Sequence, residues 1–539
     1  MERRSFLLSA GGASLAALAS GAGFARWQEI APAVHYPGRE EGHFLRDARA
    51  LPPPSSVVET DIAILGSGIA GLSAAWKLGR ERVGKGGRVL MIDGPQAFGN
   101  AAGARYGALE CPTGAHYLPL PSQESTHVRA ILADLGIIQK DPFGATPYYD
   151  ERYLVHAPEE RLLVKGQWQE GLVPALGVPE AELAEQRRFF AHMERLRGQR
   201  GADGKRLFVF PSALSSSATP HAQLDRISFK AWLEREGYRA PSLHWYLNYC
   251  CRDDYGARYD RVSAWAGLHY FAGRSGRAAN ASDSAVLTWP GGLAPLAAGM
   301  AARSGIARRP GSALRVRKTA GGVEVLCFSL KDGMPTTYIV RARKAICAMP
   351  VFVAARVVEG MADYGFDVRR HLPEYAPWLV ANFVMRHPPR ERDDLPLSWD
   401  NVVQSEPGLG YVVSTHQDIR MEPAERSVFT AYVALSHRTP HEARRWLQSA
   451  SPQQLIALAS ADLKAAYGWT LAANVERVDI TLRAHAMAVP APGFRGNAGM
   501  AALREADGPI LFAHADLSGL SVFEEASWWG WRAAERALA

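Results

Sequence analysis

The sequence predicts a mixed α/β protein of about two domains, and three observations support this fold class. First, 539 residues with 47% hydrophobic and 21% charged side chains are enough for about two to four domains with substantial cores. Second, an apolar strand, a glycine-rich loop, a helical pattern and another strand follow one another over residues 61–93. Third, residues 508–538 contain an apolar strand, an acid and a long helical pattern. Strands that alternate with helices in this way predict a parallel sheet with helices on its faces.

The composition excludes several classes of protein. The apolar fraction is too high for a disordered chain, and five cysteines are too few for a disulfide scaffold and leave at least one thiol unpaired. No group of Cys and His has the spacing of a zinc site, so we predict no metal. The net charge of +7 is dispersed, and its densest clusters, such as Arg187-Arg188, are short and lack interleaved aromatic residues. Nucleic acid is therefore not an expected partner.

Residues 1–25 have the features of an export signal. Arg3 and Arg4 precede Ser5-Phe6-Leu7 and then an uncharged, glycine- and alanine-rich stretch that ends at Ala25, which offers a cleavage site. This order resembles the twin-arginine signals of bacteria. A membrane anchor is the alternative, but four glycines and four serines make the stretch too weakly apolar for a span of about 20 residues. We therefore expect a soluble periplasmic protein, a twin-arginine export machinery as its partner, and a cofactor loaded before the folded chain is exported.

The segment over residues 61–93 has the pattern of a dinucleotide-binding unit. After the first strand, the loop and the start of the helical pattern contribute Gly66, Gly68, Ile69, Ala70 and Gly71. The first glycine permits a tight turn, the second lets the backbone approach a pyrophosphate, and the third allows close packing of helix and strand. Asp93 ends the second strand, where it can accept hydrogen bonds from a ribose. A glycine-rich structural turn is the weaker interpretation, and both FAD and NAD remain open from this unit alone.

The C-terminal segment favours FAD. A strand leads to Asp516, and a helical pattern follows over residues 521–538. This order resembles the C-terminal flavin motif of the FAD-dependent amine oxidase superfamily. The resemblance implies that Asp516 meets the ribityl side of FAD and that the backbone amide of Phe523 reaches the flavin pyrimidine. It also puts Val522 at the position of a tyrosine that belongs to the substrate cage of other members.

The resemblance covers nearly all of the mature chain. Residues 287–293 contain a Gly-Gly segment before a helix, and a hairpin around Asp332-Gly333 leads into a strand that ends in Ala348-Met349-Pro350, as in the superfamily. It implies a discontinuous Rossmann-type FAD-binding domain of the GR2 type with an inserted mixed α+β substrate domain. The expected divisions are a signal at 1–25, a linker or wrapping arm at 26–56, the FAD-binding domain at 57–120, 285–374 and 488–539, and the substrate domain at 121–284 and 375–487.

The sequence departs from the superfamily at two cofactor contacts. The second glycine loop usually ends in Gly-Gly-Arg, but this chain has Gly99-Asn100, so the arginine that contacts phosphate must be Arg105 or be absent. Many members place a lysine beneath the flavin, on a strand that resembles residues 378–385. Ala381 or Asn382 takes that position here. The missing lysine favours a dehydrogenase that passes electrons to a quinone or a cytochrome, with oxygen as the remaining acceptor.

The candidate catalytic residues are Trp378, Asn382 and His485. His485 falls near the position of the covalent cysteine in related oxidases. Four roles are open for it: facing the flavin, orienting the substrate, carrying a covalent flavin link, or packing as a structural histidine. We predict a non-covalent FAD.

The closest resemblance is to bacterial spermidine dehydrogenases, through Gly99-Asn100, the turn at residues 114–117 and the strand ending of residues 512–519. It implies a polyamine-like substrate. A polyamine site needs aromatic walls and a few carboxylates, because a distal ammonium is paired while the reacting amine must be neutral. The sequence offers as candidates Trp289, Trp378, Trp399, Trp528, Trp529, Glu110, Asp400, Glu524, His116 and His416.

The expected function is therefore that of an exported FAD-dependent oxidoreductase. It would transfer a hydride from the carbon next to an amine to flavin N5 and give an imine that hydrolyses. One alternative is a desaturase or dehydrogenase that acts on carbon–carbon bonds of an apolar substrate. Another is a flavin-bearing binding protein without turnover.

Overall fold

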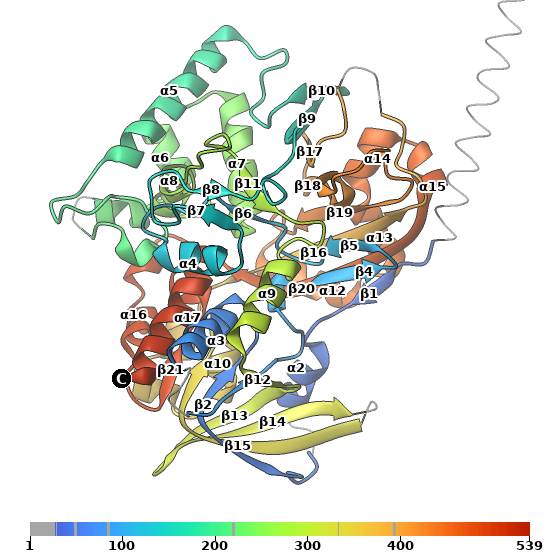
Figure 1. The fold of residues 1–539 in the computed structure, drawn as a ribbon. Coiled ribbons are helices and arrows are strands. Elements are labelled where there is room, and N and C mark those ends of the chain that lie inside the picture. The colour runs from blue at the N-terminus through green and yellow to red at the C-terminus, as the bar shows by residue number, and fades with distance from the viewer. Residues whose placement is uncertain are drawn as a thin grey trace, which may run out of the picture.

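The computed structural model describes residues 27, 30–47, 51–82, 87–217, 221–331, 334–391 and 395–539. The expected export signal at residues 1–25 lies outside the described residues, as does the Asp332-Gly333 turn. Two large sheets, one of seven strands and one of eight, form the framework, and helices surround both (Figure 1). Within the described ranges, no helix is both long enough and apolar enough to cross a membrane.

The seven-stranded sheet contains the predicted strand–loop–helix–strand unit. Its strands are β2 (Val57–Leu65), β3 (Val89–Ile92), β12 (Ala307–Arg309), β13 (Ser312–Thr319), β14 (Gly322–Lys331), β15 (Met334–Cys347) and β21 (Ile510–Phe512). Parallel pairing joins β12, β3, β2, β15 and β21, while β13, β14 and the first part of β15 form an antiparallel meander. The predicted α/β class is confirmed by this topology.

Alternate residues of this sheet pack into two different cores. Ile64 and Ile346 belong to the core that contains α3 (Ile69–Arg82), α9 (Ala294–Ser304) and α17 (Phe523–Leu538). Leu65 and Cys347 belong to the core that contains the meander, α10 (Val351–Val357) and α16 (Ala498–Glu505). Because the five strands are parallel, their carboxyl ends meet at one edge, where ligands of open α/β sheets bind. The glycine loop, Asp93 and Asp516 all follow strands at that edge.

The last helix of the chain packs directly on the first helix of the dinucleotide-binding unit (Figure 1). The hydroxyl of Ser73 on α3 donates to Ser527 on α17 at 2.9 Å. A Cβ added at Gly530 would overlap the backbone carbonyl of Ala70, so only glycine permits this approach. The close contact holds the N-terminus of α17 beside the glycine loop.

We expect Gly530→Ala to lower the stability of the protein by about 1–3 kcal/mol. The added methyl group must displace the backbone of α3, and this overlap outweighs the gain of about 1 kcal/mol in helix propensity. A thermal unfolding scan measures the effect as a lower midpoint. Gly198→Ala is the matched control, because a Cβ at this helical glycine meets no atom within 4 Å. Equal midpoints for the two variants would contradict the packing argument.

The eight-stranded sheet lies beside the first one in the chain's other large unit (Figure 1). In spatial order its strands are β1 (Ala33–His35), β20 (Val475–Ala488), β16 (Tyr375–Met385), β19 (Ser427–Ala434), β18 (Gly408–Val413), β17 (Asp400–Val403), β9 (Glu160–Val164) and β10 (Gln167–Glu170). Residues 26–56, expected to be a linker or a wrapping arm, therefore contain a strand: β1 pairs in parallel with β20 at the sheet edge. The segment also contains α2 (Arg39–Arg46), so a plain linker is wrong.

The two faces of β16 meet different surroundings, although every residue of the strand is buried. Leu379, Ala381 and Phe383 pack against α12 (Pro440–Ser449), α13 (Pro452–Ala459) and α14 (Ala461–Tyr467). Trp378 and Val380 point to the opposite face, toward the core shared with the helices of residues 126–273. The helix expected over residues 452–467 is interrupted at Ser460 into α13 and α14.

The remaining elements connect or cover the two sheets. The other helices are α4 (Thr126–Asp134), α5 (Glu180–Gly198), α6 (Phe229–Arg235), α7 (Pro241–Tyr255), α8 (Ala264–Gly273), α11 (Val368–His371) and α15 (Thr470–Asn474). The short strands are β4 (Gly103–Tyr106), β5 (Leu109–Pro112), β6 (Tyr117–Pro119), β7 (Ile138–Lys140), β8 (Tyr148–Tyr149) and β11 (Val286–Thr288). Short 3₁₀ turns include η1 (Gly99–Ala101), η2 (Ser212–Leu214), η5 (Ser414–Gln417) and η7 (Ala515–Leu517). All five cysteines are buried free thiols.

Candidate functional site

A cavity of about 150 Å³, partly open to solvent, lies where the two large units meet. Its wall is formed by η1 and the following turn, the end of α7, strands β16, β19 and β20, and the first residues of α17. The charged and aromatic side chains in the wall are Asp253, Asp254, Glu524, Arg274, Arg483, His116, Tyr117, Trp378, Tyr432 and Phe523. Apolar walls with a few charged groups are typical of a small-molecule site.

The glycine loop has the geometry that a bound pyrophosphate needs. Gly66 has a φ of +113°, and a Cβ there would press on the carbonyl of Ala348, so this turn requires glycine. A Cβ at Gly68 would meet no atom within 4 Å, so space remains in front of that backbone. A Cβ at Gly71 would overlap the carbonyl of Gly66, which explains the third glycine. Ile69 and Ala70 belong to the first turn of α3.

Asp93 and the second glycine loop lie close to this first loop. The Asp93 carboxylate, at the end of β3, accepts a hydrogen bond from Arg308 Nε at 2.8 Å, and its ribose contact stays a prediction. Gly99 begins η1 with a φ of +56°. A Cβ built on Gly99 would contact the Cα atom of Gly68, so the two loops lie close together. Asn100 lines the cavity, and its Nδ2 donates to the carbonyl of Ala486 at 2.8 Å.

Asp516 is a fully buried carboxylate with one oxygen left without a donor. Its Oδ2 accepts from Tyr375 Oη at 2.6 Å and from the Val351 backbone N–H at 2.9 Å. Its Oδ1 lies 3.1 Å from Nδ1 of His514, but that nitrogen accepts the backbone N–H of Asp516, so no donor reaches Oδ1 among the described residues while His514 is neutral. Burial alone raises the pKa of Asp516, but nearby His514 and the two hydrogen bonds outweigh it and lower the pKa. An ionised oxygen without a donor fits the hydroxyl of a ribityl chain.

The first turn of α17 also has unpaired polar groups. Val522 occupies the N-cap position without a side-chain hydrogen bond, and Phe523 begins the helix. The hydroxyl of Ser521, just before them, is buried without a partner among the described residues. All three residues line the cavity. A helix N-terminus without a cap attracts electronegative groups such as the carbonyls of a flavin ring.

Arg483 on β20 is a buried cation without an acidic partner. Its guanidinium donates to the carbonyl of Thr113 at 3.1 and 3.2 Å, to the carbonyl of Gly99 at 3.4 Å and to Gln96 Oε1 at 3.1 Å. It forms no ion pair with any acid in the described part of the chain. Burial lowers the pKa of Arg483 to about 10, so the side chain stays charged at neutral pH. A bound cofactor with phosphates or an electron-rich ring would supply the missing negative charge.

Arg105 lies outside the cavity wall, and its contact with phosphate stays a prediction. It lies on the β4–β5 hairpin, where it pairs with Glu110, and 70% of its side chain is exposed. Because β4 is a short exposed hairpin strand, the pairing with Glu110 directs the guanidinium away from the cavity, which neither residue lines. Arg483, which the sequence analysis missed, is the arginine that contacts the second glycine loop. The only signal for it was its place directly after the apolar end of a strand pattern at Leu482 and two residues before His485.

His116 is the centre of an aromatic cluster in the cavity wall. Its ring centroid lies 5.0 Å from Tyr117, 4.7 Å from Tyr432 and 5.5 Å from Trp399. Trp378 extends the cluster with an edge contact to Tyr432 at 6.3 Å, and its indole Nε1 has no partner among the described residues. Burial lowers the pKa of His116 to about 3, so the imidazole is neutral at physiological pH. Electron-rich rings around a neutral imidazole favour a cationic or amine ligand.

Several buried carboxyls lie next to this aromatic cluster. Asp253 and Asp254, at the end of α7, both line the cavity, and Asp254 pairs with Arg274 at 2.6 Å. Burial raises the pKa of Asp253 to about 7, with Asp254 adding to the shift and Arg274 opposing it. Burial likewise raises the pKa of Glu524 to about 7. Asp253 and Glu524 therefore change charge near neutral pH, and a bound cation would favour their ionised forms.

Asp400 continues the acidic group beyond the cavity wall. It pairs in register with Glu160 across β17 and β9. Burial and the charges of Asp253 and Glu160 raise the pKa of Asp400 well above its ordinary value. The sequence analysis named Asp400 and Glu524 but missed Asp253 and Asp254. The sequence signal available for Asp253 and Asp254 was that two adjacent acids end a buried helical pattern. A buried acid without a partner of opposite charge is costly.

Two of the three candidate catalytic residues lie outside the cavity wall. Asn382 is buried in the sheet, and its Oδ1 accepts from Thr430 at 2.8 Å; Val380, on the same face of β16, lines the cavity instead. His485 stacks on Phe352 with centroids 4.5 Å apart, while its neighbours Ala486 and Met487 line the cavity. Burial and two nearby arginines lower the pKa of His485 to about 4. Only Trp378 of the three is in the wall.

Other candidates from the sequence are also elsewhere. Trp528 and Trp529 line a different pocket, and Trp529 Nε1 donates to Ser518 at 2.6 Å. Trp289 packs on Tyr153, and His416 bonds to the carbonyl of His156 at 2.9 Å. Trp289 and His416 therefore contact neighbouring elements, and none of the four side chains lines the candidate cavity.

Comparison with protein families supports the dinucleotide-binding unit. Residues 64–135 match the family described as NAD(P)-binding Rossmann-like domain. The match begins in β2 and includes both glycine loops. No curated protein matches the chain.

Solved structures match almost the whole chain. Putrescine oxidase bound to putrescine has a TM-score of 0.61 at 18% identity, and the match covers 89% of this chain and 99% of that chain. Cyclohexylamine oxidase from Brevibacterium oxydans has a TM-score of 0.60 at 18% identity, with 89% and 98% covered. An oxidoreductase from Methanosarcina mazei has a TM-score of 0.54 at 12% identity, with 88% and 100% covered. The predicted likeness to amine oxidases is thus confirmed at the level of the fold, which this chain shares with putrescine oxidase and cyclohexylamine oxidase.

Proposed function

We propose that the protein is an FAD-dependent oxidoreductase that oxidises a polyamine-like amine. The observation that carries this proposal is the composition of one cavity wall. Arg483 and the uncapped start of α17 offer positive groups to a cofactor, and the His116 aromatic cluster with Asp253 and Asp254 offers a site for a cationic amine. The shared fold of putrescine oxidase supports the same conclusion.

The residues present fit a non-covalent FAD. The backbone at Gly66 and Gly68 would hold its pyrophosphate, Asp516 its ribityl chain, and the first turn of α17 its ring. When bound, FAD supplies the acceptor for the hydride that leaves the carbon next to the amine. No side chain of the described cavity wall is arranged as a nucleophile with its base, which agrees with chemistry carried by a cofactor.

The cavity wall would bind and orient the amine in two ways. The aromatic rings around His116 exclude water and thereby lower the pKa of the reacting amine, which favours its neutral, reactive form. The carboxylates of Asp253 and Asp254 would pair with the distal ammonium of a diamine and fix the chain in one direction. Binding energy from the distal group thus positions the reacting carbon.

Anaerobic mixing of the FAD-loaded protein with putrescine or spermidine tests the proposal. We expect loss of the visible flavin absorption within minutes, together with an aldehyde product. A set of neutral, apolar alcohols and ketones is the control and should leave the absorption unchanged. Bleaching by apolar substrates but by no amine would instead indicate a carbon–carbon dehydrogenase. Absence of bleaching by every compound would indicate a binding protein.

The preference for diamines should depend on pH. Because burial raises the pKa values of Asp253 and Glu524 to about 7, both carboxyls are mainly neutral at pH 6 and ionised at pH 8. Pairing with a distal ammonium therefore strengthens as the pH rises. We expect the ratio of kcat/KM for putrescine to that for butylamine to increase about tenfold between pH 6 and pH 8. The monoamine corrects for ionisation of the reacting amine, and a flat ratio would contradict this assignment.

We also propose export by the twin-arginine route to the periplasm, with a quinone or cytochrome as electron acceptor and oxygen as the alternative. The order of residues around Arg3 and Arg4 supports the export route. The apolar Val380 in the cavity wall supports the choice of a quinone or cytochrome as acceptor. Replacing Arg3 and Arg4 by Lys should retain the protein in the cytoplasm. Continued export of the double variant would refute this route. Stopped-flow reoxidation with each acceptor in turn identifies the preferred one.

A further inference from the structure

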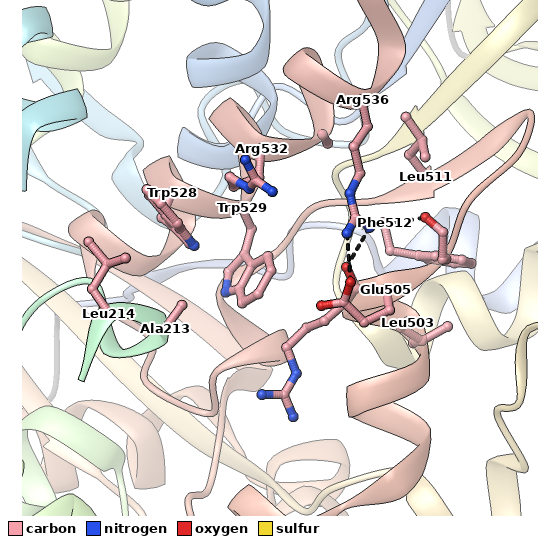
Figure 2. A pocket seen from close by; sticks show the side chains of 13 residues that line it. Ala213, Leu214, Leu503, Glu505, Leu511, Phe512, Trp528, Trp529, Arg532 and Arg536 are labelled. Carbon is pink, nitrogen blue, oxygen red and sulfur yellow. Dashed lines mark hydrogen bonds and ion pairs between the residues drawn. The ribbon is translucent and has the colours of Figure 1, made fainter. Parts of the chain in front are cut away.

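A second pocket, separate from the candidate site, lies on the outer side of α17. It has a volume of about 360 Å³, is partly open to solvent, and is bounded by η2, the end of α16, β21 and α17. Figure 2 shows the rings of Trp528 and Trp529, the side chains of Leu511 and Phe512, and the guanidinium of Arg532 around it. The two pockets share no residue, although α17 contributes to both.

Two of the three arginines that line the pocket are already paired with acids, Arg536 with Glu505 and Arg532 with Glu535, each at 2.8 Å. Arg504, Arg532 and Arg536 line it together with a single acid, Glu505. Arg536 holds that acid with an ion pair of 2.8 Å, drawn in Figure 2, and also donates to the carbonyl of Arg504 at 2.7 Å. Glu505 is therefore already engaged.

Arg504 is the cation that lacks a partner. Its Nε donates to the carbonyl of Met500 at 3.2 Å, but its two terminal nitrogens have no acceptor within the described part of the chain. Burial lowers the pKa of Arg504 and leaves its charge in a partly dehydrated surrounding. A guanidinium in that state gains more from a carboxylate or sulfonate than a fully hydrated one does.

The wall of the pocket is held in place before any ligand arrives. Trp529 Nε1 donates to Ser518 Oγ at 2.6 Å, and that hydroxyl donates to the buried carboxylate of Glu525 at 2.5 Å. Glu525 also accepts the backbone N–H of Ser212, which fixes η2 against α17. A preformed wall reduces the entropy that a ligand must lose on binding.

We propose that this pocket binds a small amphipathic anion with a flat aromatic body. The indole and phenyl surfaces would contact the body, and Arg504 would hold its carboxylate or sulfonate. This site is independent of the proposed amine oxidation. Because Trp528 is part of the wall, a bound aromatic ring should change its fluorescence.

Titration of the purified full-length protein with 1-naphthoate tests this site. We expect one binding event per chain by calorimetry and at least tenfold weaker binding of the neutral 1-naphthamide. Arg504→Gln should weaken naphthoate binding at least tenfold, whereas Arg187→Gln, an exposed arginine on α5, should leave it unchanged. Trp528→Phe should remove most of the fluorescence change. If Arg504→Gln does not fold, the comparison of naphthoate with naphthamide on the unchanged protein still tests the need for an anion. Equal binding of the amide, or undiminished binding by the folded Arg504 variant, would overturn the proposal.

Discussion

Replacing Asp253 by Asn is expected to reduce the preference of the protein for putrescine over butylamine by about tenfold to a hundredfold. A hydrogen bond to a charged group contributes about 1.5–3 kcal/mol, and a tenfold ratio corresponds to about 1.4 kcal/mol. The amide keeps the shape of the carboxylate but cannot carry its charge. The loss should therefore fall on the diamine, whose distal ammonium needs that charge, and mainly on its KM.

Steady-state kinetics with both amines at pH 8 measure this change. Asp260→Asn is the matched control, because Asp260 follows the same helix but is exposed and pairs with Arg258 at 3.9 Å. The control should keep the preference of the unchanged protein. In the Asp253 variant, the increase of the preference with pH should also become smaller. A variant that loses activity toward both amines equally would show that Asp253 supports the fold or the reaction rather than the distal ammonium.

Replacing Arg483 by Met is expected to weaken FAD binding at least tenfold and to lower the thermal midpoint of the apoprotein. The substitution leaves the carbonyl of Thr113 without a donor, and an unsatisfied buried group costs about 1–3 kcal/mol, whereas the carbonyl of Gly99 keeps the backbone N–H of Ala102. It also removes the one buried cation that contacts the second glycine loop. Both effects act on the same turn, so cofactor affinity and stability should fall together.

Fluorescence titration of the apoprotein with FAD gives the affinity, and a thermal scan gives the midpoint. Arg426→Met is the control, because Arg426 lies just outside the same sheet and pairs with Glu476 at its surface. Only small changes are expected there, as for most surface ion pairs. If the Arg483 variant binds FAD as tightly as the unchanged protein, the guanidinium has no cofactor role and serves only to join β20 to the loop.

The sequence predicted the fold and the cofactor edge well, because those features depend on local patterns. A strand, a glycine loop and a helix N-terminus are encoded within about 30 residues, and parallel strands bring their carboxyl ends together without further information. The spacing of Gly66, Gly68 and Gly71 therefore indicated the loop that the structure has. Asp516 and Phe523 could be assigned only by resemblance, since their distance from that loop is visible only in the fold.

The substrate side was harder to predict because it depends on strand register. Trp378 pairs with Arg483 and Ala376 with Met487, so β20 has two more residues than β16 in this stretch. That irregularity contains His485 and directs it toward Phe352, and no sequence pattern announces such a bulge. On β16, a shift of one residue changes the face of every side chain. Ala381 packs against a helical core, and Asn382 forms a buried hydrogen bond with Thr430. Val380 is the residue of this stretch that lines the cavity.

Asp253 and Arg483 were missed for a related reason. Each lies in a segment with an ordinary buried pattern, and its charge is unusual only because of what surrounds it in space. The sequence distance between α7 and β20 gives no indication that both reach the same cavity. Burial and pairing of charges are therefore the information that the structure adds.

The contact between α3 and α17 has a consequence for synthesis of the chain. Ser73 and Ser527 are 454 residues apart, and β21 adds to β15 only after residue 510 has been made. A growing chain therefore carries the apolar side of α3 and one edge of β15 uncovered until residues 510–538 have been made. Chaperones and proteases meet that surface throughout translation. A chain that ends before residue 510, through an early stop codon, keeps it exposed and becomes a substrate for degradation.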